Sequence, residues 1–359
     1  MTPPLRLADP QRLDLAAVWL RERRGGEHEN ASHWPLLWGW EREREQVLRE
    51  LEALTYRLEP RERWASPEPG EPERQRWRGR DALVLKALAG LLQDLLPLSR
   101  RCTHLKGQGG LKGALRQVRA ALPRARFVCR TDVASYYASI DPHRLQDMLA
   151  GALKGHPDRS AILSLTWQAT QRSSERGGLF RDHHQGIARG CPLSPVLGAF
   201  FLRALDERLE RLPVFAVRYM DDVLILAESR WKLRRAVRVL NQTFAELGLS
   251  KHPDKTFIGR VERGFDFLGY RFGEGEIKPA QITVRKFLGR LSRLHEQKRA
   301  SPDWRSALGV YVRRWWRWVT SGGVGVDPEG KPRELLAVQS WLMLLASTPP
   351  PCSLLAASP

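Results

Sequence analysis

Cysteine is scarce in this chain, and long apolar runs are missing. The four cysteines, Cys102, Cys129, Cys191 and Cys352, show no C-x-x-C spacing, so the sequence predicts neither a zinc site nor a disulfide framework. No apolar run approaches the roughly 18 residues that a membrane span needs, and the N-terminus lacks the basic-then-apolar pattern of a signal peptide. These absences predict a cytoplasmic protein with reduced thiols and no membrane partner.

Acidic residues are too few to balance the basic ones. The 59 Lys and Arg residues face 40 Asp and Glu residues, which gives a formal net charge of +19. The basic residues also cluster: residues 101–126 contain seven Lys or Arg and no acid, and residues 281–320 contain ten against two acids. Two separated blocks of one sign indicate a polyanionic partner that is contacted at two places.

The distribution of apolar and turn-forming residues predicts both helices and strands. Strand-like runs begin at Phe127, form a hairpin over 214–227 and continue as one strand over 264–272. The stretch 62–80 is predicted to be a loop, because it is charged and rich in Pro and Gly. Helices are predicted over 11–54, 81–96, 111–122, 142–155, 195–210 and 230–247.

Two acidic motifs carry the clearest chemical signal. TDVASYYASID (131–141) and RYMDDVLIL (218–226) each place an acid at the end of an apolar strand. Carboxylates brought together in this way repel each other unless a cation lies between them. Two Mg²⁺ ions, with Mn²⁺ as a substitute, would relieve that repulsion and support phosphoryl transfer. An isolated Asp-Asp pair can also be a simple turn, so the surrounding motifs decide between the two interpretations.

The surrounding motifs occur in the order found in reverse transcriptases. RYMDDVLIL resembles the YxDD hairpin of that family, and TDVASYYASID resembles its first carboxylate motif. The likeness is closest to bacterial group II intron-like and retron-like enzymes, and it runs from about residue 56 to 272. Further similar segments are RGRDALVLKAL (78–88), GIARGCPLSPVLGAFFL (186–202), LGLSKHPDKT (247–256) and GFDFLGYRF (264–272), with GQGGLKGALRQV (107–118) a looser match.

The resemblance implies a role for individual acids and for one lysine. Asp132, the carbonyl of Val133, Asp221 and Asp222 would hold the metal ions. The three aspartates would be catalytic, together with Lys255 as the general acid that protonates the departing pyrophosphate.

A second group of residues would bind the nucleotide. Tyr137 corresponds to the steric gate that excludes a 2′-hydroxyl group, and Gly190 lies in a stiff turn that approaches the nucleotide. Arg189 departs from the family, which most often has Gln at that position. Arg78 and Arg80 are candidates for gripping the triphosphate.

The resemblance also implies a fold: an α+β right-hand polymerase with fingers, an antiparallel-sheet palm and a helical thumb. We expect an N-terminal helical extension over 1–55, fingers and palm over 56–275, a basic helical thumb over 276–345 and a tail over 346–359. In the thumb segment RRWWRW (313–318), the tryptophans either stack on nucleic acid or face the thumb core, and the core interpretation is favoured.

The implied activity is RNA-directed DNA polymerisation from a primer 3′-hydroxyl group. The expected partners are an RNA template, an RNA/DNA primer–template duplex and deoxynucleoside triphosphates, with a cognate structured RNA as a further candidate. Two alternatives stay open: an RNA-binding maturase-like protein with secondary or no polymerase activity, and an untemplated or protein-primed DNA polymerase. No counterpart of the family's DNA-binding and HNH-type region follows residue 345, which favours a host-adopted role such as phage defence.

Overall fold

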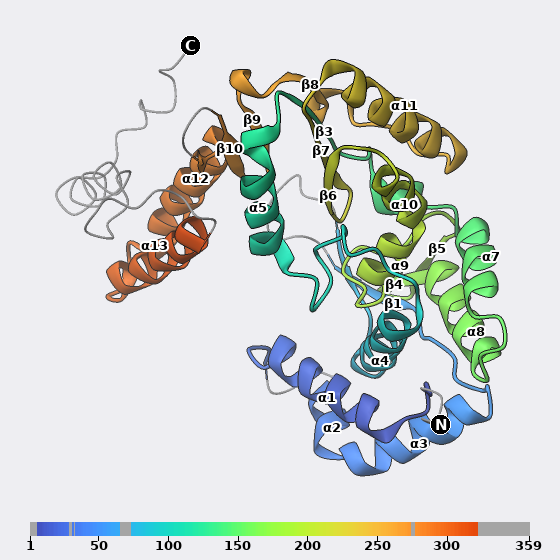
Figure 1. Ribbon diagram of the computed structural model, residues 1–359. Coiled ribbons are helices and arrows are strands. Elements are labelled where there is room, and N and C mark those ends of the chain that lie inside the picture. The colour runs from blue at the N-terminus through green and yellow to red at the C-terminus, as the bar shows by residue number, and fades with distance from the viewer. Residues whose placement is uncertain (1–5, 29–30, 32, 65–72, 274–276, 322–359) are drawn as a thin grey trace.

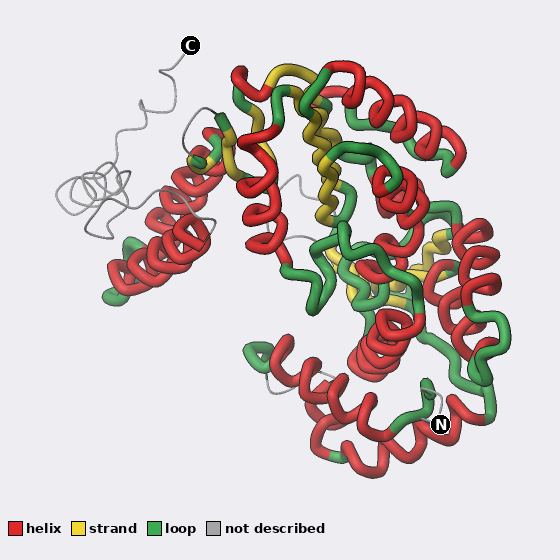
Figure 2. Tube along the Cα trace, viewed as in Figure 1, coloured by secondary structure: helices red, strands yellow, loops and turns green. Residues whose placement is uncertain are grey.

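The computed structural model describes residues 6–28, 31, 33–64, 73–273 and 277–321. The described elements form an arc, with the N-terminal helices at one end, a β-sheet and its helices in the middle, and two C-terminal helices at the other end (Figure 1). Helices and largely antiparallel strands are both abundant (Figure 2), which confirms the α+β class. The expected tail and the expected thumb beyond residue 321 lie outside the described residues.

A four-stranded antiparallel sheet occupies the middle of the arc. Its order is β6–β7–β3–β8, and its strands are β6 (Phe215–Tyr219), β7 (Asp222–Ala227), β3 (Phe127–Thr131) and β8 (Phe257–Arg260). Both faces of β7 are covered, which explains why this strand is apolar at every position after Asp222, and β3 contributes buried residues to both faces as well. Cys129 and Ile225 belong to the main core, whereas Val128 and Leu224 belong to a second core on the opposite face.

Different helices cover the two faces of this sheet. The main core includes α9 (Ser194–Phe201), α10 (Arg203–Glu210) and α11 (Arg230–Glu246). The second core includes α5 (Gly110–Ala121) and the aromatic residues of a small sheet, β9 (Phe265–Phe267), β10 (Tyr270–Phe272) and β11 (Lys278–Pro279). Short helical segments connect these elements: α6 (Tyr136–Ser139) and the 3₁₀ turns Leu122–Arg124, Pro253–Lys255 and Val261–Arg263.

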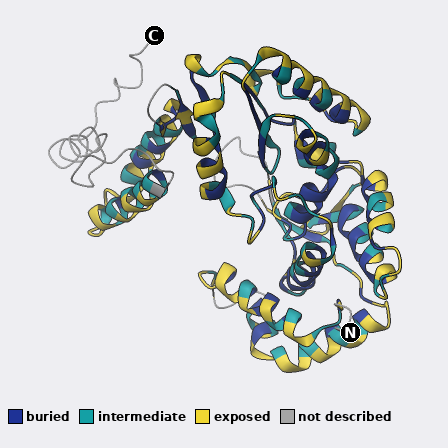
Figure 3. Ribbon diagram, viewed as in Figure 1, coloured by how far each residue is buried: buried dark blue, intermediate teal, exposed yellow. Residues whose placement is uncertain are grey.

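The N-terminal part of the arc contains a second, mixed sheet. Its order is β2–β1–β4–β5, with β2 (Arg74–Arg76), β1 (Arg61–Trp64), β4 (Arg172–Arg176) and β5 (Leu179–His183). Around it lie α1 (Pro10–Arg24), α2 (His33–Trp38), α3 (Trp40–Glu52), α4 (Gly79–Leu95), α7 (Pro142–Ala152) and α8 (Arg159–Thr170). Helix α4 is buried along most of its length (Figure 3), and Leu13 and Leu20 of α1 share its core.

The C-terminal helices α12 (Gln281–Lys298) and α13 (Trp304–Ser321) pack on each other and on the small sheet. The Trp315 ring stacks on Phe287 with a centroid distance of 4.1 Å, and the Trp318 ring stacks on Tyr270 at 4.7 Å. These contacts confirm the core interpretation for Trp315 and Trp318 of RRWWRW. The three arginines of that segment are exposed.

Several predicted elements match the structure: the helices 81–96, 111–122, 142–155 and 230–247, the strand from Phe127 and the hairpin 214–227. The single helix predicted over 11–54 is wrong, because the chain breaks at Gly25 and again at Gly39 to give three helices. The helix predicted over 195–210 is divided at Leu202.

The predictions also missed strands in three places. The loop predicted over 62–80 contains β1 and β2, which pair with each other and extend the mixed sheet. The strand predicted over 264–272 is a hairpin, because Leu268 and Gly269 both adopt positive φ and turn the chain between β9 and β10. A second hairpin, β4–β5, was missed although Gly177–Gly178 is a recognisable hairpin turn. Within the described residues, no helix is long and apolar enough to cross a bilayer.

Candidate active site

The pairing of β3 with β7 brings the two acidic motifs together. Thr131 lies opposite Val223, so the same register places Asp132 opposite Asp222. Strands β6 and β7 are joined by the two-residue turn Met220–Asp221, since Tyr219 pairs with Asp222. The three aspartates that the sequence predicts to be catalytic therefore lie at the same end of the sheet.

Two of these carboxyl groups share a hydrogen bond. Burial, followed by the hydrogen bond and the charge of the adjoining Asp132, raises the pKa of Asp221 to about 7. Burial also acts to raise the pKa of Asp132, but hydrogen bonds from Asp221 and Lys255 outweigh it and lower that pKa. At neutral pH the pair therefore shares a proton for part of the time, which is the expected response of two buried acids without a cation between them.

Lys255 already provides one positive charge at this site. Its ammonium group donates to Asp132 Oδ2 at 2.6 Å, and this hydrogen bond raises the pKa of Lys255. The backbone fixes the contact, because the N–H of His252 donates to the carbonyl of Asp132 at 2.8 Å. The lysine therefore shows that the acid pair accepts a cation.

Asp222 faces a different partner from the other two acids. Its carboxylate lies 3.8 Å from the guanidinium of Arg130, and burial followed by repulsion from Asp132 raises its pKa to about 6. In the described part of the chain, no three His, Cys, Asp or Glu side chains converge on one point as ready ligands. The acids thus form a close pair with a third beside it, which fits Mg²⁺, since that ion binds through one or two carboxylates plus substrate phosphates.

Val133 and Tyr137 follow Asp132 on a chain that leaves the sheet. Val133 is buried and bridges to Lys251, but the flanking backbone hydrogen bonds run through Ala134 and Asp132 and do not use the Val133 carbonyl. The hydroxyl group of Tyr137 is buried without a hydrogen-bond partner, and burial followed by the charge of Asp221 raises its pKa. Tyr137 thus lies beside the acid pair with an unpaired polar group.

The loop with Arg189 and Gly190 is attached to Tyr137. The N–H of Ile187 donates to the Tyr137 carbonyl at 2.7 Å, and a Cβ at Gly186 would lie 2.5 Å from that same oxygen. Both Arg189 and Gly190 are exposed, and the Arg189 carbonyl accepts a hydrogen bond from the buried Arg61 at 3.2 Å. The structure therefore brings these two predicted nucleotide residues to the same region as the predicted gate.

Arg78 and Arg80 are engaged elsewhere. Arg80 binds both oxygens of Glu50, at 2.9 and 3.0 Å, and Arg78 binds Glu59 at 2.7 Å. The structure thus pairs both arginines with acids of the N-terminal segment rather than with the aspartates of β3 and β7. Gripping a triphosphate would require these ion pairs to break.

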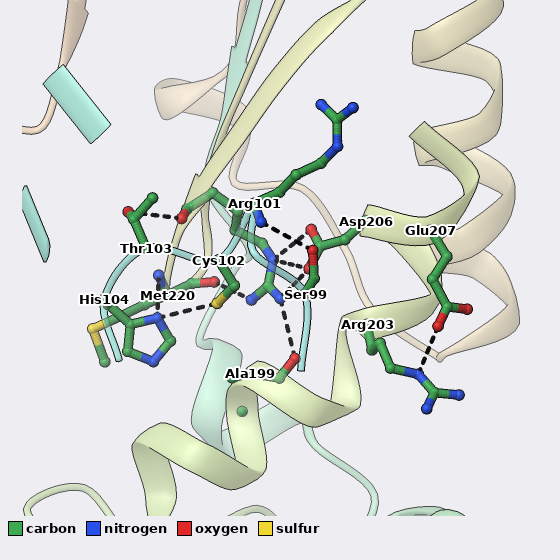
Figure 4. Close-up of polar contacts among 12 residues, drawn as sticks. Ser99, Arg101, Cys102, Thr103, His104, Ala199, Arg203, Asp206, Glu207 and Met220 are labelled. Carbon is green, nitrogen blue, oxygen red and sulfur yellow. Dashed lines mark hydrogen bonds and ion pairs between the residues drawn. The ribbon is translucent and has the colours of Figure 1, made fainter. Parts of the chain in front are cut away.

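A buried ion pair that the sequence did not predict lies beneath the Met220–Asp221 turn. Arg218 of β6 is fully buried and binds Asp206 of α10, with 2.9 Å between Nε and Oδ1. The same guanidinium donates to the carbonyls of Ala199 at 3.1 Å and Met220 at 2.7 Å. Figure 4 shows Asp206, Ala199 and Met220 around this centre. An arginine inside the apolar run FAVRYM was the available signal, since a buried charge requires a partner.

His104 supports the turn from the other side. Its Nδ1 accepts from the N–H of Met220 at 3.1 Å (Figure 4). Its Nε2 lies 3.0 Å from the carbonyl of Pro195. These contacts require a neutral ring with the proton on Nε2, and burial lowers the pKa of His104 to about 4. Met220 itself has a φ of 57°, a left-handed conformation that costs free energy unless neighbouring contacts hold it.

This palm sheet, with acids at its hairpin, lies between a mixed finger sheet and a helical thumb, which is the architecture of a right-hand polymerase. The chain belongs to the reverse transcriptase (RNA-dependent DNA polymerase) family, whose model matches residues 75–272, more than half of the chain.

Relatives are distant. Over 237 residues the chain is 24% identical to Protein YkfC of Escherichia coli (strain K12); the match covers 54% of this chain and 60% of that protein. Among solved structures, the apo telomerase from Candida tropicalis is 13% identical with a TM-score of 0.44, covering 55% of this chain and 40% of that one. The telomerase from Candida albicans with a fragment of telomeric RNA is 12% identical with a TM-score of 0.43, covering 67% and 46%.

The buried ion pair gives a first prediction. Replacing Asp206 with Ala should destabilise the protein by about 3–5 kcal/mol, because Arg218 would stay buried without a counter-charge. Chemical denaturation measures this loss. The double variant Asp206→Leu/Arg218→Met should recover most of the stability, and equal losses in the single and double variants would contradict the argument.

The acid pair gives a second prediction, for protein kept in a metal chelator. The raised pKa of Asp221 means that the folded state binds a proton more tightly than the unfolded state. The free energy of unfolding therefore decreases as the pH rises through about 4 to 7, where the unfolded state loses this proton first. Asp221→Asn should therefore raise the melting temperature by a few degrees at pH 8 and by less at pH 5. The exposed Asp147→Asn serves as a control, and a pH-independent shift would rule out this cause.

Proposed function

We propose that the chain is an RNA-directed DNA polymerase that extends a primer 3′-hydroxyl group with deoxynucleotides. The observation that carries the proposal is the acid pair: Asp132 and Asp221 lie in hydrogen-bond contact at the end of β3 and at the β6–β7 turn, within a domain of the reverse transcriptase family. Such a pair is costly unless it serves to bind cations.

The metal ligands would be Asp132, Asp221 and the carbonyl of Val133, with Asp222 assisting. Two Mg²⁺ ions, or Mn²⁺ in their place, would activate the primer hydroxyl and stabilise the leaving pyrophosphate oxygen. The carbonyl of Val133 is suited to this role because the neighbouring backbone hydrogen bonds, from Ala134 N–H and to the Asp132 carbonyl, do not use it. Arg130 beside Asp222 and Arg218 beneath the turn keep the acids in place.

Lys255 would act as the general acid toward the pyrophosphate. Its raised pKa keeps the ammonium protonated at neutral pH, and it lies within reach of the reacting centre through its contact with Asp132. Tyr137 would exclude a nucleotide that carries a 2′-hydroxyl group. Gly190 and Arg189 would line the nucleotide-binding site. The charge of Arg189, where relatives most often carry Gln, would add attraction for the triphosphate.

The domain limits and the nucleic-acid partners follow from the same arrangement. We propose that fingers and palm span 56–275 and that the thumb spans 276–345, because the helices α12 and α13 follow from Gln281 onward. The short strand β11 (Lys278–Pro279) pairs with the small sheet and would join the two parts. Arg313, Arg314 and Arg317 are exposed on α13 and would follow the backbone of an RNA/DNA primer–template duplex.

The central test is primer extension on a primed RNA template with labelled deoxynucleotides and Mg²⁺. Asp221→Ala should lower the rate by at least about 10³-fold while leaving template binding intact. Asp147→Ala, an exposed acid on α7, is the matched control. A fully active Asp221→Ala variant, or a folded, RNA-binding wild type that makes no product, would contradict the proposal.

Sequencing the product separates the remaining interpretations. A copy of the template supports templated synthesis, whereas a random or homopolymeric product indicates the untemplated or protein-primed alternative. RNA binding that persists with no DNA product indicates the maturase-like alternative. The phage-defence role is tested separately by deleting the gene and measuring sensitivity across a broad phage panel.

The gate residue gives a further prediction. Tyr137→Ala should reduce the preference for deoxynucleotides over ribonucleotides on the order of 10²-fold, because the ring no longer clashes with the 2′-hydroxyl group. The measurement is kcat/KM for both nucleotide types. Tyr137→Phe should retain the preference, since the Tyr137 hydroxyl makes no hydrogen bond; an unchanged preference in the alanine variant would remove Tyr137 from this role.

A further inference from the structure

Helix α11 carries a row of exposed arginines on the outside of the palm. Arg230, Arg234 and Arg238 recur every four residues, so they follow one line along the helix with steps of about 6 Å. Arg235 is exposed beside this row, and no acid occurs in the helix before Glu246. In the described residues, none of these four arginines forms an ion pair with an acid.

A groove lies between this row and the edge strand β8. It has a volume of about 450 Å³, with an apolar floor that includes Phe127, Leu233 and Ile258. Its rim is formed by Arg230, Arg234, Arg260 and Arg263. Strand β8 is the last strand of the palm sheet, so no further strand covers this side of the groove.

The acids near the groove are already neutralised. Glu228 pairs with Lys232 at 2.6 Å, and Glu262 lies 3.7 Å from Arg260. The ring of Trp231 is 74% exposed, and the guanidinium of Arg234 lies over it at 5.2 Å. The surface therefore combines the uncompensated positive charge of the α11 arginines with an exposed aromatic ring, a combination suited to nucleic acid.

This surface is separate from the predicted active site. Arg260 lies opposite Phe127 at the start of β3, whereas Asp132 follows the end of that strand. Five residues of extended chain correspond to about 17 Å. Helix α11 also lies on the side of the palm away from α12 and α13 (Figure 1), so a duplex held between thumb and palm would not cover it.

We propose that the α11–β8 groove binds the phosphate backbone of a structured RNA while the active site holds a primer–template duplex. A regularly spaced row of arginines suits the repeating charges of a nucleic-acid backbone, because each guanidinium can contact one phosphate group. An acidic protein segment is the competing partner, and the binding experiment therefore includes an acidic peptide. The inference goes beyond polymerisation, since this surface would tether an RNA without taking part in the reaction.

The test uses the full chain and a 3′-blocked RNA hairpin with a stem of about 16 base pairs, the length one duplex-binding module spans. Fluorescence anisotropy measures hairpin binding while a saturating, blocked primer–template duplex fills the active site. Arg234→Glu/Arg238→Glu/Arg260→Glu should weaken hairpin binding at least about tenfold and reduce its salt dependence. Primer extension on a short primed template should stay within about twofold of wild type.

The matched control changes the same charge elsewhere. Arg21→Glu/Arg23→Glu/Arg42→Glu replaces three exposed arginines of α1 and α3, and it should retain hairpin binding. Equal loss in both triple variants would show a general effect of net charge and overturn the proposal. Wild-type protein that releases the hairpin when the active site is filled, or that binds an acidic peptide instead, would overturn it as well. Because binding is measured without synthesis, a failure of polymerisation would be recognised separately.

Discussion

Repulsion between Asp132 and Asp221 is the constraint around which the rest of the palm is built. The two carboxyl groups reach hydrogen-bond contact only because β3 and β7 pair in a register that brings a strand end beside a hairpin turn. The cost appears as the raised pKa of Asp221 and the ammonium of Lys255 bound to Asp132. The turn that carries Asp221 must be held rigidly to keep the two acids in contact. Buried polar side chains beneath the turn hold it.

That support comes from residues distant in sequence. Arg218 and Asp206 form a buried pair that also binds the Met220 carbonyl, and His104 accepts the N–H of the same residue. Met220 keeps its left-handed conformation because both its backbone groups are bound. The buried ion pair contributes little net free energy of folding but is costly to break. Its main effect is therefore to hold the Met220–Asp221 turn in position.

The positive charge of the chain is divided among different tasks. Some arginines are structural: Arg218 is buried in the palm, and Arg80 ties α4 to α3 through Glu50. Others remain exposed, in α13 and in the row along α11. The net charge of +19 therefore indicates a polyanionic partner without showing which basic residues contact it.

The sequence by itself determined most elements of the palm and the position of the three aspartates at strand ends, and the order of its motifs implied the class of the fold. The strand and hairpin positions are local features, because an apolar strand that ends in an acid is visible in consecutive residues. The core interpretation of Trp315 and Trp318 in α13 was also correct, since large aromatic side chains gain free energy mainly through burial. Where local signals were weak, as at Leu268–Gly269 or in β1 and β2, the prediction failed.

Only the tertiary structure decided which residues support the acids and which arginines are available. Arg78 and Arg80 looked like phosphate ligands, but Glu59 and Glu50 hold them. Lys255 lies 123 residues from Asp132 in the sequence yet binds its carboxylate. Ion pairs of this kind depend on packing between distant segments, and spacing along one chain carries no information about a partner that only folding brings near.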